Sequence, residues 1–105
     1  MANYLLSYHG GSTPESPEDQ AKVMKDWTDW FGGLGKAVVD GGNPTATSKT
    51  VKADGTVSDG GGANPVTGYS ILMADNLDSA VAMAKGCPIV ASGGSIEVSE
   101  ILAMS

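Results

Sequence analysis

Hydrophobic residues recur along this chain with two different spacings, one typical of strands and one typical of helices. Residues 3–9 (NYLLSYH) and 66–74 (VTGYSILMA) are nearly continuous apolar runs, which predict strands covered on both faces. Residues 95–102 (SIEVSEIL) alternate Ile and Val with Glu and Ser, which predicts a strand with one polar face. The run at 66–74 is long and free of charge, so it is the best candidate for a central strand.

A helix is predicted from Pro17 to the glycines at 32–35. Ser16 is a favourable N-cap, and Pro17 suits the first helical position because the N–H that it lacks would have no partner there. The glycines are expected to end the helix because they favour left-handed backbone conformations. Apolar residues recur at helical spacing on one face, namely Val23, Trp27, Trp30, Phe31 and Leu34, with Met24 at its edge.

A second helix is predicted between the last two strands. Asp75 is the expected N-cap, and Gly86 followed by Pro88 is expected to end the helix. Its inward positions are Leu77, Ala80 or Val81, and Ala84. The chain then turns at 91–94 into the last strand.

A β-hairpin is predicted between the two helices. Residues 46–53 and 56–58 flank Asp54-Gly55, which is a strong signal for a two-residue hairpin turn. The remaining elements are a short strand at 37–40 and loops at 12–17 and 59–65.

This order of elements predicts a single α+β domain spanning residues 1–105. We expect a ferredoxin-like antiparallel sheet with both helices on one face. The sequence offers no third helix for the opposite face, although the runs at 3–9 and 66–74 are apolar on both sides. We therefore expect a homodimer in which a second copy covers that face, packed sheet to sheet.

The charge balance restricts the expected partners. The chain carries six Lys, no Arg and twelve acidic residues, which gives a net charge of −6. Nucleic-acid binding depends on clustered cations, so neither nucleic acid nor an anionic membrane surface is expected as a partner. The first residues lack the features of a signal peptide, and no apolar run approaches the roughly 20 residues of a membrane span. With a single cysteine as well, we expect a soluble cytoplasmic protein.

The turns and element boundaries carry a family resemblance. They comprise Asp59-Gly60 before a loop, Gly68-Tyr69 at a strand start, Asp75-x-Leu77-Asp78-x-Ala80 at a helix start, Gly86-Cys87-Pro88, and GGSIEV at 93–98. With the early Tyr4-Leu5-Leu6 strand, these motifs resemble the YCII-related (DGPF-domain) family over most of the chain. The resemblance implies a dimeric α+β barrel of ferredoxin-like subunits, as in small bacterial proteins of unassigned function. Some relatives are linked to sigma factors of the extracytoplasmic type, and others are suspected of enzymatic activity resting on a His-Asp pair.

The chain departs from that family in three places. The family's Asp-Gly-Pro-Phe is replaced by Asp59 followed by three glycines. Ile89 follows the Gly-Cys-Pro turn where relatives often carry His, and residues 17–34 contain no histidine. These departures weaken the transfer of an enzymatic role.

His9 is the only histidine in the sequence, and it ends the first predicted strand beside Gly10-Gly11. Imidazole titrates near neutral pH, so His9 is the candidate general acid or base, with Asp75 or Asp59 as the carboxylate that orients it. The alternative is a structural histidine that is partly exposed or hydrogen-bonded to the backbone.

The aromatic face of the first helix predicts either ordinary core packing or a ligand pocket. In the second case Trp27 and Trp30 line a small apolar pocket between helix and sheet, closed by Tyr8 or Tyr69. Cys87 is expected to be a structural turn residue, because it follows a helix C-terminus, where a thiolate is disfavoured.

No metal or cofactor is expected. One His, one Cys and scattered carboxylates match no metal-ligand spacing, and the glycines at 60–62 lack the Lys-Ser/Thr of a phosphate-binding loop. Three functions fit the sequence. We favour a small-molecule-binding or regulatory homodimer. The alternatives are an enzyme of undefined reaction that uses a His-Asp acid/base pair in the barrel cleft, and a structural protein-interaction module whose acidic exterior meets a basic partner.

Overall fold

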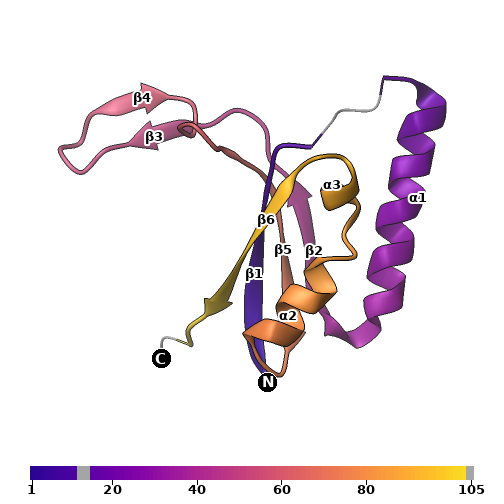
Figure 1. Ribbon diagram of the computed structural model, residues 1–105. Helices are drawn as coiled ribbons and strands as arrows, with labels where there is room; N and C mark the ends of the chain where they lie inside the picture. The colour runs from indigo at the N-terminus through magenta and orange to yellow at the C-terminus, as the bar shows by residue number, and fades with distance from the viewer. Residues whose placement is uncertain (12–14, 104–105) are drawn as a thin grey trace.

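The computed structural model describes residues 1–11 and 15–103 and contains a four-stranded sheet with helices on one face (Figure 1). The strands are β1 (Ala2–His9), β2 (Val38–Pro44), β5 (Val66–Ala74) and β6 (Ser95–Ile101), in the order β2-β5-β1-β6. All neighbouring pairs are antiparallel. The predicted α+β class is therefore confirmed, and the strand order is compatible with a ferredoxin-like fold. Positions 12–14 of the predicted loop at 12–17 lie outside the described residues.

The helical elements are α1 (Pro17–Leu34), a short 3-10 turn η1 (Gly35–Ala37), α2 (Leu77–Ala84) and α3 (Pro88–Ala91). Helix α1 begins as predicted, since Ser16 Oγ accepts a hydrogen bond from the backbone N–H of Asp19 at 3.1 Å. The N-cap prediction for α2 was wrong by one residue, because Asn76 Oδ1 accepts the bond from the N–H of Ser79 at 2.8 Å. None of the helices in the described part of the chain is long and apolar enough to cross a membrane.

Helix α3 was not predicted. Pro88 was expected only to stop the preceding helix, but it stands at the first position of a new one-turn helix, where its missing N–H costs nothing. The short helix carries Ile89 into the core.

The hydrophobic core lies between the sheet, α2 and α3. Tyr4, Leu6 and Tyr8 alternate along β1, and each is at most 4% exposed, so this face of β1 points toward the helices. The other core residues are Leu72 and Ala74 from β5, Ala80 and Ala84 from α2, Cys87, and Ile89. The small alanines let α2 lie close to the sheet.

The opposite side of the sheet, which we call the open face, also carries apolar side chains. Leu5 of β1 and Tyr69, Ile71 and Met73 of β5 alternate with the core positions and are half-buried. Leu5 and Ile71 are direct cross-strand partners. In Figure 1 α1 stands on the other side of the sheet from this face.

Strands β3 (Lys49–Val51) and β4 (Val57–Asp59) form a separate two-stranded hairpin, shorter than predicted. The turn lies where it was predicted but is one residue longer, because the N–H of Lys52 donates to the carbonyl of Thr56 at 2.8 Å and leaves Ala53, Asp54 and Gly55 as a three-residue loop. Gly55 has a φ of 88°, and its N–H donates to the carbonyl of Lys52 at 2.9 Å. Residues 45–65, which we call the arm, carry this hairpin away from the sheet on the side opposite α1 (Figure 1). The radius of gyration is accordingly 15.1 Å, against about 13 Å for a compact chain of this length.

Candidate ligand-binding site

A cavity of about 470 Å³ lies between α1 and the sheet. Met24, Trp27 and Phe31 line it from α1, Tyr8 from β1, and Ile89 from α3. Met24 is 70% exposed, so the cavity reaches the surface of the molecule at this side chain. Most of the lining is carbon, as is usual for pockets that bind small organic molecules.

The cavity exists because α1 is held away from the sheet by its own aromatic side chains. Trp27 meets Tyr8 edge to face at a centroid distance of 5.2 Å and Trp30 at 5.7 Å. Phe31 lies 5.9 Å from Trp27. These rings contact one another and Tyr8 of β1, and α1 has no fully buried residue over its 18 positions. The helix therefore covers the sheet without filling the space beneath it.

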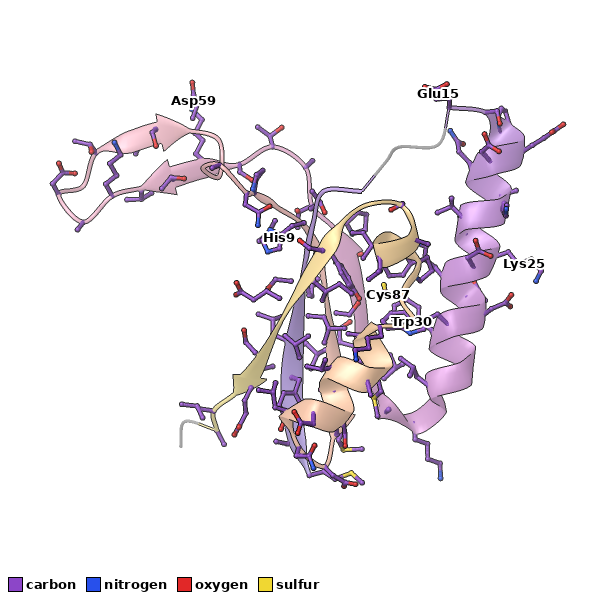
Figure 2. All side chains as sticks on the ribbon, in the orientation of Figure 1. His9, Glu15, Lys25, Trp30, Asp59 and Cys87 are labelled. Atoms are coloured by element: carbon purple, nitrogen blue, oxygen red, sulfur yellow. The ribbon has the colours of Figure 1, made fainter. Side chains whose placement is uncertain are left out.

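Trp30 fixes the C-terminal half of α1 to the α2 side of the molecule. Its Nε1–H donates to the carbonyl of Met83 at 3.1 Å. An added Cβ on Gly86 would lie 3.4 Å from the indole, so the ring rests against this glycine. Figure 2 shows Trp30 pointing from α1 toward the segment that joins α2 and α3.

A glycine bulge in β2 forms the opposite wall. The register between β2 and β5 shifts between Asp40 and Asn43, which leaves Gly41 and Gly42 out of regular pairing. Gly42 has a φ of 75°, and a Cβ there would collide with the carbonyl of Tyr69. The N–H of Gly42 donates to Asp40 Oδ1 at 2.8 Å, which holds the bulge in place.

Two hydroxyl groups of the lining are hydrogen-bonded to each other. Tyr8 donates its hydroxyl hydrogen to Ser70 Oγ at 2.7 Å, and Ser70 donates to the carbonyl of Gly41 at 2.7 Å. Ser70 is fully buried. This chain links β1, β5 and the bulge of β2, so the hydroxyl groups satisfy one another and set the shape of the wall.

Burial keeps the ionisable groups beside the cavity neutral. It raises the pKa of the Tyr8 hydroxyl far above its usual value, and the nearby Cys87 thiol adds to this effect. Burial also raises the pKa of Cys87 to about 11. Because a thiolate is the reactive form of cysteine, Cys87 is an inert thiol at neutral pH, in line with the structural role predicted for it.

The four predicted pocket residues differ in where they lie relative to the cavity. Tyr8 and Trp27 line the cavity with their rings. Tyr69 lines it only through its main chain, because the side chain of neighbouring Ser70 points toward the helices and that of Tyr69 points to the open face. The prediction for Trp30 was wrong, since this residue does not line the cavity but borders an open groove between α1 and α3.

His9 is held by the backbone, as in the structural alternative considered for it. Its Nδ1 lies 3.0 Å from the carbonyl oxygen of Asn64 and 3.2 Å from that of Pro65, both at the end of the arm. Figure 2 shows the imidazole where the arm meets the sheet. Both neighbours are carbonyl oxygens, which can only accept a hydrogen bond, so Nδ1 carries the hydrogen and donates it.

The structure does not bring His9 together with its predicted carboxylate partners. Ala2 pairs with Ala74, whereas His9 pairs with Val66, so His9 and Asp75 stand at opposite ends of the sheet. The eight residues of β1 separate these ends by roughly 23 Å at about 3.3 Å per residue. Asp59 lies instead on the hairpin, where its carboxylate is 94% exposed and 3.5 Å from Lys49 Nζ. The predicted acid/base pair of His9 and Asp75 is therefore wrong. The sequence alone does not give the strand register that determines where Asp75 lies.

The chain, compared with models of known protein families and with curated proteins, matches none of them. Within residues 1–11 and 15–103, no three side chains of the His, Cys, Asp and Glu types gather as a metal site would require.

Two features of the site were missed by sequence reasoning. The bulge had a signal in the paired glycines that follow the apolar residues of β2, because glycines inside a strand often mark a bulge. Ser70 had a weaker one, as a hydroxyl in an otherwise apolar central strand. Neither signal indicates that the two features line the same cavity as Phe31, because that depends on the three-dimensional packing.

Proposed function

We propose that this chain binds a small neutral aromatic or otherwise planar apolar molecule in the cavity beneath α1, and that it acts as a binding or regulatory protein. The observation that carries the proposal is the cavity of about 470 Å³ whose lining includes Tyr8, Trp27 and Phe31. Small-molecule sites in proteins commonly occupy roughly 300–1,000 Å³ and are lined by aromatic residues with few polar groups.

The lining favours a neutral ligand over a charged one. Among the described residues, the cavity is lined by no Lys, His, Asp or Glu side chain. A buried charge without a partner costs several kcal/mol or more, so an ionised ligand would be rejected. The edges and faces of Trp27 and Phe31 favour a flat ring system, which can stack on them or meet them edge to face.

Calorimetric titration with naphthol and with naphthoate tests the proposal. Both are planar two-ring molecules, but only naphthoate carries a charge at neutral pH. We expect naphthol to bind and naphthoate to bind at least about tenfold more weakly, because its carboxylate would lose its hydration. Equal affinities, or no heat from either compound, would contradict the proposal.

A pair of glycine variants locates the binding. Gly41 lines the cavity, and an added Cβ there would lie 3.9 Å from the ring of Phe31, so Gly41→Leu fills the cavity. Gly33 has open space around its Cα, so Gly33→Leu adds the same side chain at the surface of α1. Naphthol binding is expected to be lost in Gly41→Leu and kept in Gly33→Leu.

The open face supports the proposal that the protein works as a homodimer packed sheet to sheet. Leu5, Ile71 and Met73 are apolar, half-buried residues on a side of the sheet that carries none of the described helices. Alternate residues of an antiparallel strand are usually polar where the sheet meets water, so an apolar patch on the second face indicates a covering partner. Such a dimer would form a dimeric α+β barrel, as in the YCII-related family that the sequence resembles.

Sedimentation velocity tests the homodimer. The wild-type chain is expected to sediment as a dimer at micromolar concentration, and Ile71→Asp is expected to shift it to a monomer with an unchanged far-UV circular dichroism spectrum. A wild-type chain that remains monomeric at 100 times that concentration would refute the dimer and leave the ligand proposal untouched.

A further inference from the structure

We infer that the arm, residues 45–65, clasps a second copy of the chain, and that each arm of the dimer packs its valines against the partner subunit. This inference rests on the proposed homodimer and adds to it a contact outside the sheet. The observations are the exposure, placement and charge of the arm.

The hairpin of the arm is incomplete by itself. Val51 and Val57 are cross-strand partners, and they are 71% and 57% exposed. An isolated two-stranded hairpin is marginally stable in water and needs further strands or a packed face to persist. Here strands of three residues each pair only with one another. A hairpin of this kind with two exposed valines indicates a contact that the single chain does not provide.

Hydrogen bonds at the base of the arm fix its direction relative to the sheet. His9 Nδ1 donates to the carbonyl groups of Asn64 and Pro65, and Thr45 N–H donates to the carbonyl of Thr67 at 3.0 Å. The hydroxyl of Thr45 also donates to the carbonyl of Val66 at 2.9 Å. Both ends of the arm are therefore hydrogen-bonded to the end of the sheet, and His9 holds one of them there.

The direction of the arm points to a partner on the open face. Figure 1 places the hairpin and α1 on opposite sides of the sheet, so the arm overhangs the side on which the second copy is proposed to lie. Residues 45–54 can extend up to roughly 30 Å, whereas packed sheets lie about 10 Å apart. An arm of this length passes the sheet of the partner and reaches its edge.

The arm would enlarge the interface between the two sheets. Four strands of seven to nine residues span roughly 19 Å by 25 Å, or about 500 Å² of sheet face. A stable protein interface buries about 800 Å² of accessible surface on each partner, and apolar contacts made by the arm would add to the area that the sheet supplies. In an isologous dimer each subunit contacts its partner with its own arm and is contacted by the partner's arm, so the area buried by the arm occurs twice.

The neutral charge of the arm allows it to bind a second copy of this acidic chain. The whole chain has a net charge of −6, so two copies repel each other over most of their surfaces. The arm contains two lysines and two aspartates, which cancel, and Lys49 and Asp59 pair within it at 3.5 Å. It is thus a neutral, valine-bearing segment of an acidic chain.

Dimer dissociation constants from sedimentation equilibrium test the inference. The double variant Val51→Ser/Val57→Ser is expected to weaken the dimer at least about tenfold, because the two arms of the dimer together lose four apolar side chains from the contact. Both valines are exposed in the single chain, so the variant keeps its fold. Val90→Ser on α3 makes the same change at a residue that is 48% exposed and away from both surfaces, and it is expected to change the constant less than about twofold.

The outcomes separate the arm from the sheet contact. A dimeric wild type with an unchanged dissociation constant in Val51→Ser/Val57→Ser overturns the inference about the arm and leaves the sheet-packed dimer standing. A monomeric wild type overturns both. Slower amide hydrogen exchange at residues 49–59 above the dissociation constant than below it supports the arm contact, and equal exchange contradicts it.

Discussion

Helices α1 and α2 cover the same face of the sheet in opposite ways. Helix α2 presents alanines, and Ala80 and Ala84 are 0% and 5% exposed, so the helix lies directly on the strands. Helix α1 is more than twice as long but presents large rings, which contact one another and leave a cavity beneath them. Small side chains thus produce a dense core on one half of the sheet, while bulky ones produce a space that a ligand can enter.

The largest expected difference between the two regions is in the cost of truncation. Leu72 is fully buried in the core that includes Ala80 and Ala84 of α2, so Leu72→Ala is expected to lower the free energy of unfolding by about 3 kcal/mol. Phe31 is half-buried beside an existing cavity, so Phe31→Ala is expected to cost about 1 kcal/mol or less. Urea denaturation measures both. Equal losses would mean that α1 is packed as densely as α2.

Adding volume is expected to separate the regions in the same direction, with the larger loss of stability again on the α2 side. Ala80→Leu overfills a site without free space and is expected to cost about 2 kcal/mol. Thr28 lines the cavity from an exposed position on α1, so Thr28→Leu is expected to change stability by less than about 0.5 kcal/mol. Thermal and urea unfolding of the two variants make the comparison, and a large loss in Thr28→Leu would contradict the presence of free space there.

The helix caps provide a smaller test. Asn76→Ala removes the cap of a helix that carries core residues, so a global loss of about 1 kcal/mol is expected. Ser16→Ala removes the cap of a helix without buried residues, so faster amide exchange in the first turn of α1 is expected, with a global loss of about 0.5 kcal/mol or less. Identical global losses would show that α1 unfolds only with the whole domain.

Alkaline pH tests the boundary between the two regions. Burial raises the pKa of Cys87 from its ordinary 9.0 to about 11. The unfolded thiol therefore ionises first, so the stability contributed by the neutral thiol is complete below pH 9 and is lost as the pH rises through about 11. Burial raises the pKa of Tyr8 as well, which acts in the same direction. Cys87→Ala is expected to flatten the decline of stability over this range, and an unchanged slope would assign it to other groups.

Hydrophobic periodicity predicted the elements but not the distances between them. The runs at β1 and β5 and the start of α1 were found because period and caps are local properties of the chain. The pairing of His9 with Asp75 failed because antiparallel register placed these residues at opposite ends of the sheet. The helical stripe of α1 was found, yet Val23 and Met24 are exposed. Periodicity gives the apolar face of a helix but not how closely that face approaches a sheet, and the cavity depends on this spacing.

Intermolecular nuclear Overhauser effects between bound naphthol and the protein test most directly whether the space beneath α1 is a binding site. The cavity predicts contacts from the naphthol protons to the methyl groups of Met24 and Ile89 and to the ring of Trp27, all of which line it. It predicts none to Met83, which packs on the α2 side. Contacts to Met83 without contacts to Ile89, or no contacts at saturating naphthol, would contradict the site.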